Sequence, residues 1–269
     1  MIDKTRGNII SSPDNQNFRQ FKKIASGDAL RKEGKTIVSG GKIIRDIIAA
    51  YIIPLAWIIP DSFSESDRNY QLLPGSMPAE SRLFILKRSL FNELDSFNTG
   101  PPLAVIRVPE MKPFSSEADK GAVLLIPFQD PANTGAVIRS AAAFGVKKAV
   151  SLHGSANPYS PKSIRASAGA VFSIKIFSGP SIDMVHTIDP DIPVVPLDRS
   201  GTPIHRFSFP ERFFLLPGIE GPGLPESMRE KGVSIPISDD VDSLSGPVAV
   251  SIALWEWKKT CGLKADPQV

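Results

Sequence analysis

The chain has 269 residues, a length that accommodates two domains. Apolar residues make up 42% and charged residues 22% of it, a balance that excludes disordered and fibrous proteins. The formal net charge of +3 permits a polyanionic partner without requiring one.

Cysteine and histidine usage limits the possible chemistry. The one cysteine, Cys261, cannot form a disulfide within the chain and fits a reducing cytoplasm, which is the compartment we expect. The three histidines are scattered without metal-ligand spacing, so we expect no metal site. The most apolar stretch, 47–60, is about half a membrane span and contains a proline, and the start of the sequence lacks the apolar core of a signal peptide. We therefore expect no membrane association.

Composition divides the chain into four segments. We expect a flexible tail over residues 1–13, a first domain over 14–110, a linker over 111–120 and a second domain over 121–264.

The first domain is predicted to be a small α/β unit. Apolar spacing predicts helix from Asn15 to about Ala50 and over 84–91, with short strands at 57–59 and 103–108. Residues 1–50 hold ten Lys or Arg against five Asp or Glu. This excess is typical of a surface that follows phosphates, although a solvated helix face would explain it equally well.

The second domain alternates apolar runs with helical stretches. Such an alternation predicts a parallel sheet covered on both faces. The predicted strands are 122–127, 148–152, 171–177, 193–197, 213–216 and 233–237.

Four segments of this domain carry polar or glycine-rich patterns. In the first, Asp130 and Pro131 are placed to begin a helix at the carboxyl edge of the sheet, where α/β proteins bind ligands. Arg139 stands among alanines on that helix, and a surface salt bridge is its alternative interpretation.

The remaining segments are weaker signals individually. Lys162 and Arg165 share one helical face and could contact phosphates, or form an ordinary solvated face. The glycines in 218–224 permit close backbone approach to a ligand but match neither a P-loop nor a dinucleotide fingerprint. Pro236 removes a ladder donor, so 235–237 is expected to leave the sheet before a final apolar helix that is either buried or a subunit contact.

Together, these segments resemble the SpoU (TrmH-type) branch of the SPOUT RNA methyltransferases. Asp-Pro-x-Asn-x-Gly-x-x-x-Arg-x-Ala at 130–141 is similar to the family's first motif, and Gly-x-Glu-Gly-x-Gly-Leu at 218–224 to its second. Ile-Pro-Ile at 235–237 with Ser-Leu at 243–244 resembles the third, and Ser-Pro-Lys-x-x-Arg-x-Ser-x-Gly at 160–169 the intervening helix. Residues 30–40 resemble the start of the ribosomal-protein-like RNA-binding domain of many members.

The resemblance implies an α/β fold whose C-terminal parallel-sheet domain contains a deep trefoil knot. It also implies S-adenosyl-L-methionine as cofactor, ribose 2′-O-methylation of a structured RNA, expected to be ribosomal RNA, and a homodimer formed through the C-terminal domain. The implied catalytic residues are Asn133, Arg139, Glu220 and Ser243. The implied cofactor-binding residues are Gly218, Ile235, Ile237, Leu244 and Ser245. The implied RNA-binding residues are Arg31, Lys32, Lys35, Lys162 and Arg165.

The third motif departs from the family pattern. Ser245 stands where members usually have Asn, and Gly246-Pro247 replaces the usual Val-Ser. A hydroxyl lacks the carboxamide's acceptor and reach, so an RNA-binding homologue with weak or no turnover stays an alternative. A tRNA 2′-O-methyltransferase and an unrelated α/β binding protein are further alternatives.

Overall fold

The computed structural model describes residues 7–75, 78–115, 120–219, 223–229 and 232–260. The chain forms two compact units, each with its own sheet and core. The first unit contains residues 1–110 together with 159–172, and the second contains 111–158 and 173–269. Segment 159–172, which we expected in the second domain, therefore packs with the first.

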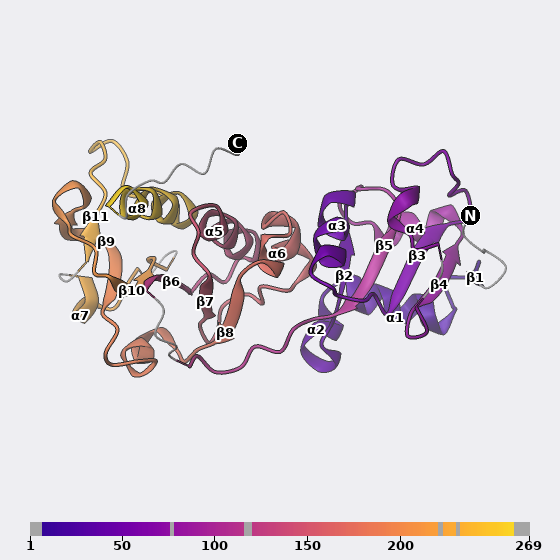
Figure 1. The fold of residues 1–269 in the computed structure, drawn as a ribbon, viewed down its shortest axis with the longest axis horizontal. Coiled ribbons are helices and arrows are strands. Elements are labelled where there is room, and N and C mark those ends of the chain that lie inside the picture. The colour runs from indigo at the N-terminus through magenta and orange to yellow at the C-terminus, as the bar shows by residue number, and fades with distance from the viewer. Residues whose placement is uncertain (1–6, 76–77, 116–119, 220–222, 230–231, 261–269) are drawn as a thin grey trace. The chain divides into compact units, whose positions relative to one another are not determined.

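The first unit is built on a five-stranded mixed sheet (Figure 1). β3 and β1 run parallel to β4, whereas β5 runs antiparallel to both β3 and β2. The strands in spatial order are β1 (Asn8–Ile10), β4 (Arg82–Leu86), β3 (Ala56–Pro60), β5 (Leu103–Arg107) and β2 (Lys35–Ser39). The helices are α1 (Gln16–Ala25), α2 (Asp28–Glu33), α3 (Gly41–Ala49), η2 (Tyr70–Leu72), α4 (Arg88–Leu94), α6 (Pro161–Ala166) and η3 (Ala170–Phe172).

Helix α1 shows why this unit folds as it does. The Asn15 side chain accepts a hydrogen bond from the Asn17 N–H at 2.9 Å and caps the helix start. Phe18, Phe21 and Ile24 follow at helical spacing and are all buried against the sheet. Burial of this apolar face, rather than helix propensity, holds α1 in place.

Three predictions for the first unit are wrong. Residues 8–10 of the expected tail form β1, because they pair with β4. Within the expected helix of Asn15 to Ala50, residues 35–39 form β2, a β-branched run paired with β5. The expected helix over 84–91 is the end of β4 followed by α4. The strands expected at 57–59 and 103–108 are confirmed as β3 and β5.

The second unit is built on a six-stranded sheet in which every strand pair is parallel, as predicted. Its strands in spatial order are β11 (Val233–Ser234), β9 (Val194–Pro203), β10 (Arg212–Leu216), β6 (Gly121–Ile126), β7 (Lys148–Ser151) and β8 (Lys175–Ser178). The helices are α5 (Pro131–Ala143), η4 (Ile182–Thr187), η5 (Ile204–Arg206), α7 (Glu226–Arg229) and α8 (Gly246–Thr260). The run 171–177 becomes strand only from Lys175, because the residues before it form η3.

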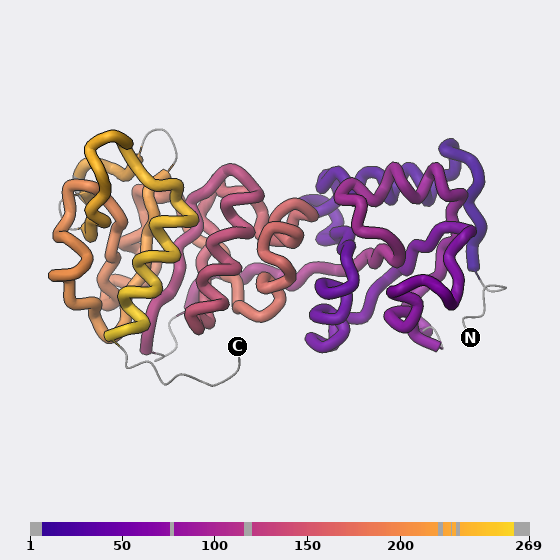
Figure 2. Tube along the Cα trace, turned by 90° about the horizontal axis from the view of Figure 1, so that it is seen from above, coloured from indigo at the N-terminus to yellow at the C-terminus, as the bar shows by residue number. Residues whose placement is uncertain are grey.

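The path of the chain after β10 crosses the sheet. β10 lies between β9 and β6, β11 forms at the edge beyond β9, and α8 then packs beside α5 (Figure 2). Two glycines allow the β9–β11 contact: a Cβ on Gly201 would overlap the backbone of Gly232, whose carbonyl accepts the Thr202 N–H at 2.9 Å. The C-terminal segment thus leaves the sheet and returns to the face where α5 lies.

The described part of the expected linker is packed rather than detached. Phe114 contacts the rings of Phe177 and Phe214, with centroids 5.1 and 5.4 Å apart. The Ser178 N–H donates to the Lys112 carbonyl at 2.9 Å. The linker prediction is wrong for these residues, because an aromatic side chain within a polar stretch reaches the core. No helix in the described ranges is long and apolar enough to cross a membrane.

Candidate active site at the carboxyl edge of the sheet

Two of the motif segments leave neighbouring strands at one edge of the second sheet. β10 pairs with β6 so that Leu215 lies opposite Leu124. Gly218 and Phe128 follow these residues by three and four positions, so the segments they begin emerge side by side. The carboxyl edge of a parallel sheet is where such folds bind ligands.

The start of α5 is fixed at this edge by its own side chains. The Asp130 carboxylate accepts the Ala132 N–H at 3.1 Å, and Pro131 occupies the first turn. The buried hydroxyl of Thr134 donates to the Phe128 carbonyl at 3.2 Å. Asn133 lies partly exposed within this first turn.

The residues that flank the third and first motifs pack directly against each other. Gly246 begins α8 at a point where a Cβ would overlap the Phe128 ring, and that ring is only 1% exposed. The Ala249 N–H donates to the Ser245 carbonyl at 3.0 Å and closes the first turn of α8. The glycine that departs from the family pattern therefore has a packing reason: it admits the aromatic ring.

Most residues of the segment between β11 and α8 are exposed or partly exposed. Ile235 and Leu244 are partly exposed, whereas Ser243 and Ser245 are exposed. Ile237 is 39% exposed, and its segment has left the sheet, as the position of Pro236 predicted. These five predicted residues lie on one accessible loop, which suits a ligand held by main-chain groups.

The second motif begins beside β9. A Cβ on Gly218 would lie 3.7 Å from the Leu197 carbonyl, an ordinary contact. Farther along, the Gly223 N–H donates to the Ile219 carbonyl at 3.1 Å, and Arg229 Nε donates to the Leu224 carbonyl at 2.8 Å. These two hydrogen bonds, one from backbone and one from a side chain, hold the described residues Gly223 and Leu224 in place. Glu220, a predicted catalytic residue, lies outside the described residues.

Arg139 is exposed on α5 and lies on another face of the helix from Asn133. Six residues of helix separate them by about 9 Å along the axis and about 240° around it. The neighbouring Ser140 hydroxyl makes a hydrogen bond with the Ser251 hydroxyl of α8 at 2.8 Å. Within one chain, therefore, α5 does not direct these two predicted residues to the same point.

The predicted RNA-binding cations all lie in the first unit. Arg31 and Lys32 are exposed on α2, and Lys162 and Arg165 are exposed on α6. Lys35 instead pairs with the Glu33 carboxylate at 2.7 Å, and this hydrogen bond holds the pKa of Glu33 below its ordinary value. Sequence spacing did not reveal that α6 belongs to the same unit as α2, because the two helices are far apart in the chain.

A cavity of about 360 Å³ opens at the opposite edge of the second sheet. Its lining includes Gly121, Lys148 and Arg212, which begin β6, β7 and β10, together with Trp257 of α8. The motif loops leave the other ends of these strands. This cavity is therefore separate from the candidate active site.

The parallel sheet, the returning C-terminal segment and the loops at its carboxyl edge define the fold of the SPOUT methyltransferases, which contain a trefoil knot. Residues 121–255, about half of the chain, match the family model described as the SpoU rRNA Methylase family. The chain belongs to this family of methyltransferases.

Relatives extend the likeness across both units. Ribosomal RNA small subunit methyltransferase G 2 of Syntrophobacter fumaroxidans is 38% identical over 93% of this chain, which spans about half (49%) of that protein's length. The 23S rRNA (guanosine(2553)-2′-O)-methyltransferase RlmP of Bacillus subtilis is 23% identical over 91% of this chain and 97% of that protein. The crystal structure of an AdoMet-bound rRNA methyltransferase from Sinorhizobium meliloti shares the fold, with a TM-score of 0.81 and 17% identity over 95% of this chain and 98% of that one.

Proposed function

We propose that this chain transfers a methyl group from S-adenosyl-L-methionine to a ribose 2′-hydroxyl of ribosomal RNA in the cytoplasm. The observation that carries the proposal is the packing of Gly246 against Phe128, which holds together the segments that flank the third and first motifs at the carboxyl edge of the sheet. The names of the relatives, which include rRNA 2′-O-methyltransferases, support the substrate class.

The loops fit a cofactor that is recognised mainly by main-chain groups. Gly218, Ile235 and Leu244 are partly exposed, and glycine leaves space for a ligand to approach the backbone closely. Ile237 and Ser245 extend this binding surface, and Asn133, Glu220 and Ser243 are the polar side chains assigned to the reaction. S-adenosyl-L-methionine supplies an already activated methyl, so the protein's task is chiefly to align donor and acceptor.

Arg139 is assigned to the acceptor hydroxyl. A guanidinium hardly deprotonates in proteins, so it orients the 2′-hydroxyl and stabilises the negative charge that develops on its oxygen, rather than acting as a base. RNA phosphates are bound by Arg31, Lys32, Lys35, Lys162 and Arg165 of the first unit. Exposed Val248 and Trp255 on α8, each 47% exposed, offer an apolar contact for a homodimer.

Removal of Arg139 tests the proposal. We expect Arg139→Ala to lower turnover with radiolabelled cofactor and protein-free rRNA by about 100-fold or more, since a lost charge-stabilising donor has effects of this order. Arg206→Ala, which removes an exposed arginine from η5, is the matched control and should keep full turnover. An Arg139→Ala enzyme with wild-type turnover would contradict the assigned role.

Ser245 favours one second candidate, an RNA-binding homologue with little turnover. Its exposed hydroxyl cannot replace a carboxamide acceptor at the same reach. A protein that binds both RNA and S-adenosyl-L-methionine without forming methylated product would support this candidate, as would turnover restored by Ser245→Asn. Parallel assays on rRNA and tRNA distinguish the two RNA substrate classes.

A further inference from the structure

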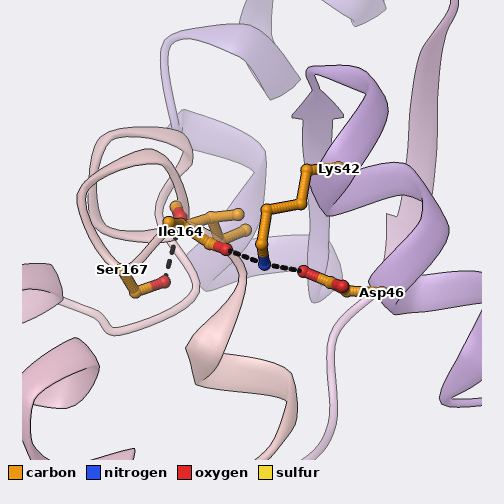
Figure 3. Close-up of polar contacts among 5 residues, drawn as sticks. Lys42, Asp46, Ile164 and Ser167 are labelled. Atoms are coloured by element: carbon orange, nitrogen blue, oxygen red, sulfur yellow. Dashed lines mark hydrogen bonds and ion pairs between the residues drawn. The ribbon is translucent and has the colours of Figure 1, made fainter. Parts of the chain in front are cut away.

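Two consecutive residues with left-handed backbone follow the end of α6. Ala168 has φ of 50° and Gly169 has φ of 89°. Figure 3 shows the Lys42 ammonium on α3, which donates to the Asp46 carboxylate at 2.7 Å. The same ammonium donates to the Ala168 carbonyl at 3.0 Å. One cation thus joins a carboxylate on its own helix to a carbonyl 126 residues away.

Gly169 is required at this contact for a second reason. A Cβ there would lie 2.5 Å from Asp46 Oδ2, so any side chain would displace the carboxylate. The end of α6 is itself stabilised by buried Ser167, whose hydroxyl donates to the Ile164 carbonyl at 2.9 Å (Figure 3). The glycine of the intervening motif therefore allows Asp46 to approach a hydrogen-bonded turn.

The rest of α6 also lies along the first unit. A Cβ on Gly40 would be 3.5 Å from Arg165 Nη1, and a Cβ on Gly27 would be 3.9 Å from Pro161 Cδ. Helix α6 also packs against β2. The exposed cations Lys162 and Arg165 are therefore held in the same body as those on α2.

We propose that Lys42 and Asp46 are positioning residues for RNA binding. With Ala168 and Gly169 they form the α3–α6 latch, which keeps the cations of α6 and α2 in one phosphate-binding surface. A rigid surface binds a polyanion with less loss of conformational entropy than two groups of cations that move independently. This inference rests on the proposed RNA substrate but makes a separate prediction about affinity.

The test compares Lys42→Met with Lys22→Met in the full chain. Lys22, on α1, is a matched exposed lysine that pairs with the Glu93 carboxylate at 3.0 Å, so both variants lose one charge and one ion pair. The probe is a labelled double-stranded RNA without cofactor. Each lost phosphate contact changes the slope of log affinity against log salt by about 0.7–0.9. We expect Lys42→Met to weaken RNA binding about 5-fold or more and to change this slope by more than the loss of one phosphate contact would. Lys22→Met should change the slope by no more than the loss of one contact would.

Further variants distinguish a positioning role of Lys42 and Asp46 from a general disruption of the fold. Lys42→Arg should recover most of the affinity, and Gly169→Ala should weaken binding less in an Asp46→Ala background than in the wild type. With protein-free rRNA, the latch variants should raise KM while leaving kcat nearly unchanged.

Equal losses for Lys42→Met and Lys22→Met would overturn the proposal, and so would a kcat that falls as far as kcat/KM. A wild-type protein that binds RNA in a salt-dependent manner but forms no methylated product would contradict the proposed function. It would leave the comparison of affinities intact.

Discussion

Two motif glycines, Gly246 and Gly169, each make room for a neighbouring side chain. Gly246 admits the Phe128 ring, which is 1% exposed, whereas Gly169 admits the carboxylate of Asp46, whose side chain is 35% exposed. In the second unit the junction is a dry packing contact, and in the first it is a charged contact near solvent. The two glycines therefore serve different purposes. Gly246 allows a loop at the candidate active site to pack against an aromatic ring, whereas Gly169 allows an ion-paired carboxylate to approach the end of α6.

The largest expected effect is on the apolar junction. Gly246→Ala should lower the free energy of unfolding by about 1–3 kcal/mol, because the new methyl would overlap a ring that close packing prevents from moving. Urea denaturation measures this loss. Gly75→Ala is the control, since a Cβ at Gly75 meets nothing within 4 Å. In a Phe128→Leu, Gly246→Ala double variant, the smaller leucine should relieve the overlap, so the loss in the free energy of unfolding should be less than the sum of the losses of the two single variants. A loss equal to that sum would contradict the contact between Gly246 and Phe128.

The charged junction should respond less in stability. Gly169→Ala forces alanine into a left-handed conformation, at a cost of about 1–2 kcal/mol. Gly34→Ala carries the same kind of strain at φ of 61° with nothing within 4 Å of its Cβ, so it isolates the backbone cost. The excess of Gly169→Ala over Gly34→Ala, measured by urea denaturation, reports the displaced Asp46 carboxylate. Equal losses would show that Asp46 can move away without cost.

The smallest expected effect concerns Tyr159, which precedes α6 and is 3% exposed. Burial raises its pKa to about 12, whereas an unfolded tyrosine titrates near 10. Its contribution to stability is present in full below pH 10 and declines as the pH rises toward 12, because only the unfolded chain ionises readily there.

Absorbance at alkaline pH, compared with a Tyr159→Phe variant, measures this titration. If Tyr159 ionised near pH 10, the ordinary value for a tyrosine, the segment before α6 would not be held by burial.

Sequence patterns predicted the second unit better than the first. Strands buried on both faces appear as continuous apolar runs, so each of the six parallel strands overlaps a predicted run, although β9 extends to Pro203, six residues beyond the predicted end. β1 and β2 were missed because their pairing with β4 and β5 is non-local, and β2 lies between α2 and α3 without a long apolar run. Local periodicity cannot detect such partners.

The place of the candidate site in the fold follows only in part from the sequence. Motif order placed the loops at the carboxyl edge, but the contact of Gly246 with Phe128 depends on a returning helix that spacing cannot reveal. The divergence of Asn133 and Arg139 was available from helical geometry, since six residues do not complete whole turns. The latch joins residues 126 positions apart and required the structure.

The position of segment 159–172 has a consequence for protein engineering. A chimera that exchanges the first domain at residue 110 would leave Ile164 and Val171, both buried, on a segment whose packing partners had been replaced. Exchange of this domain between relatives therefore means moving an internal insert along with the N-terminal piece.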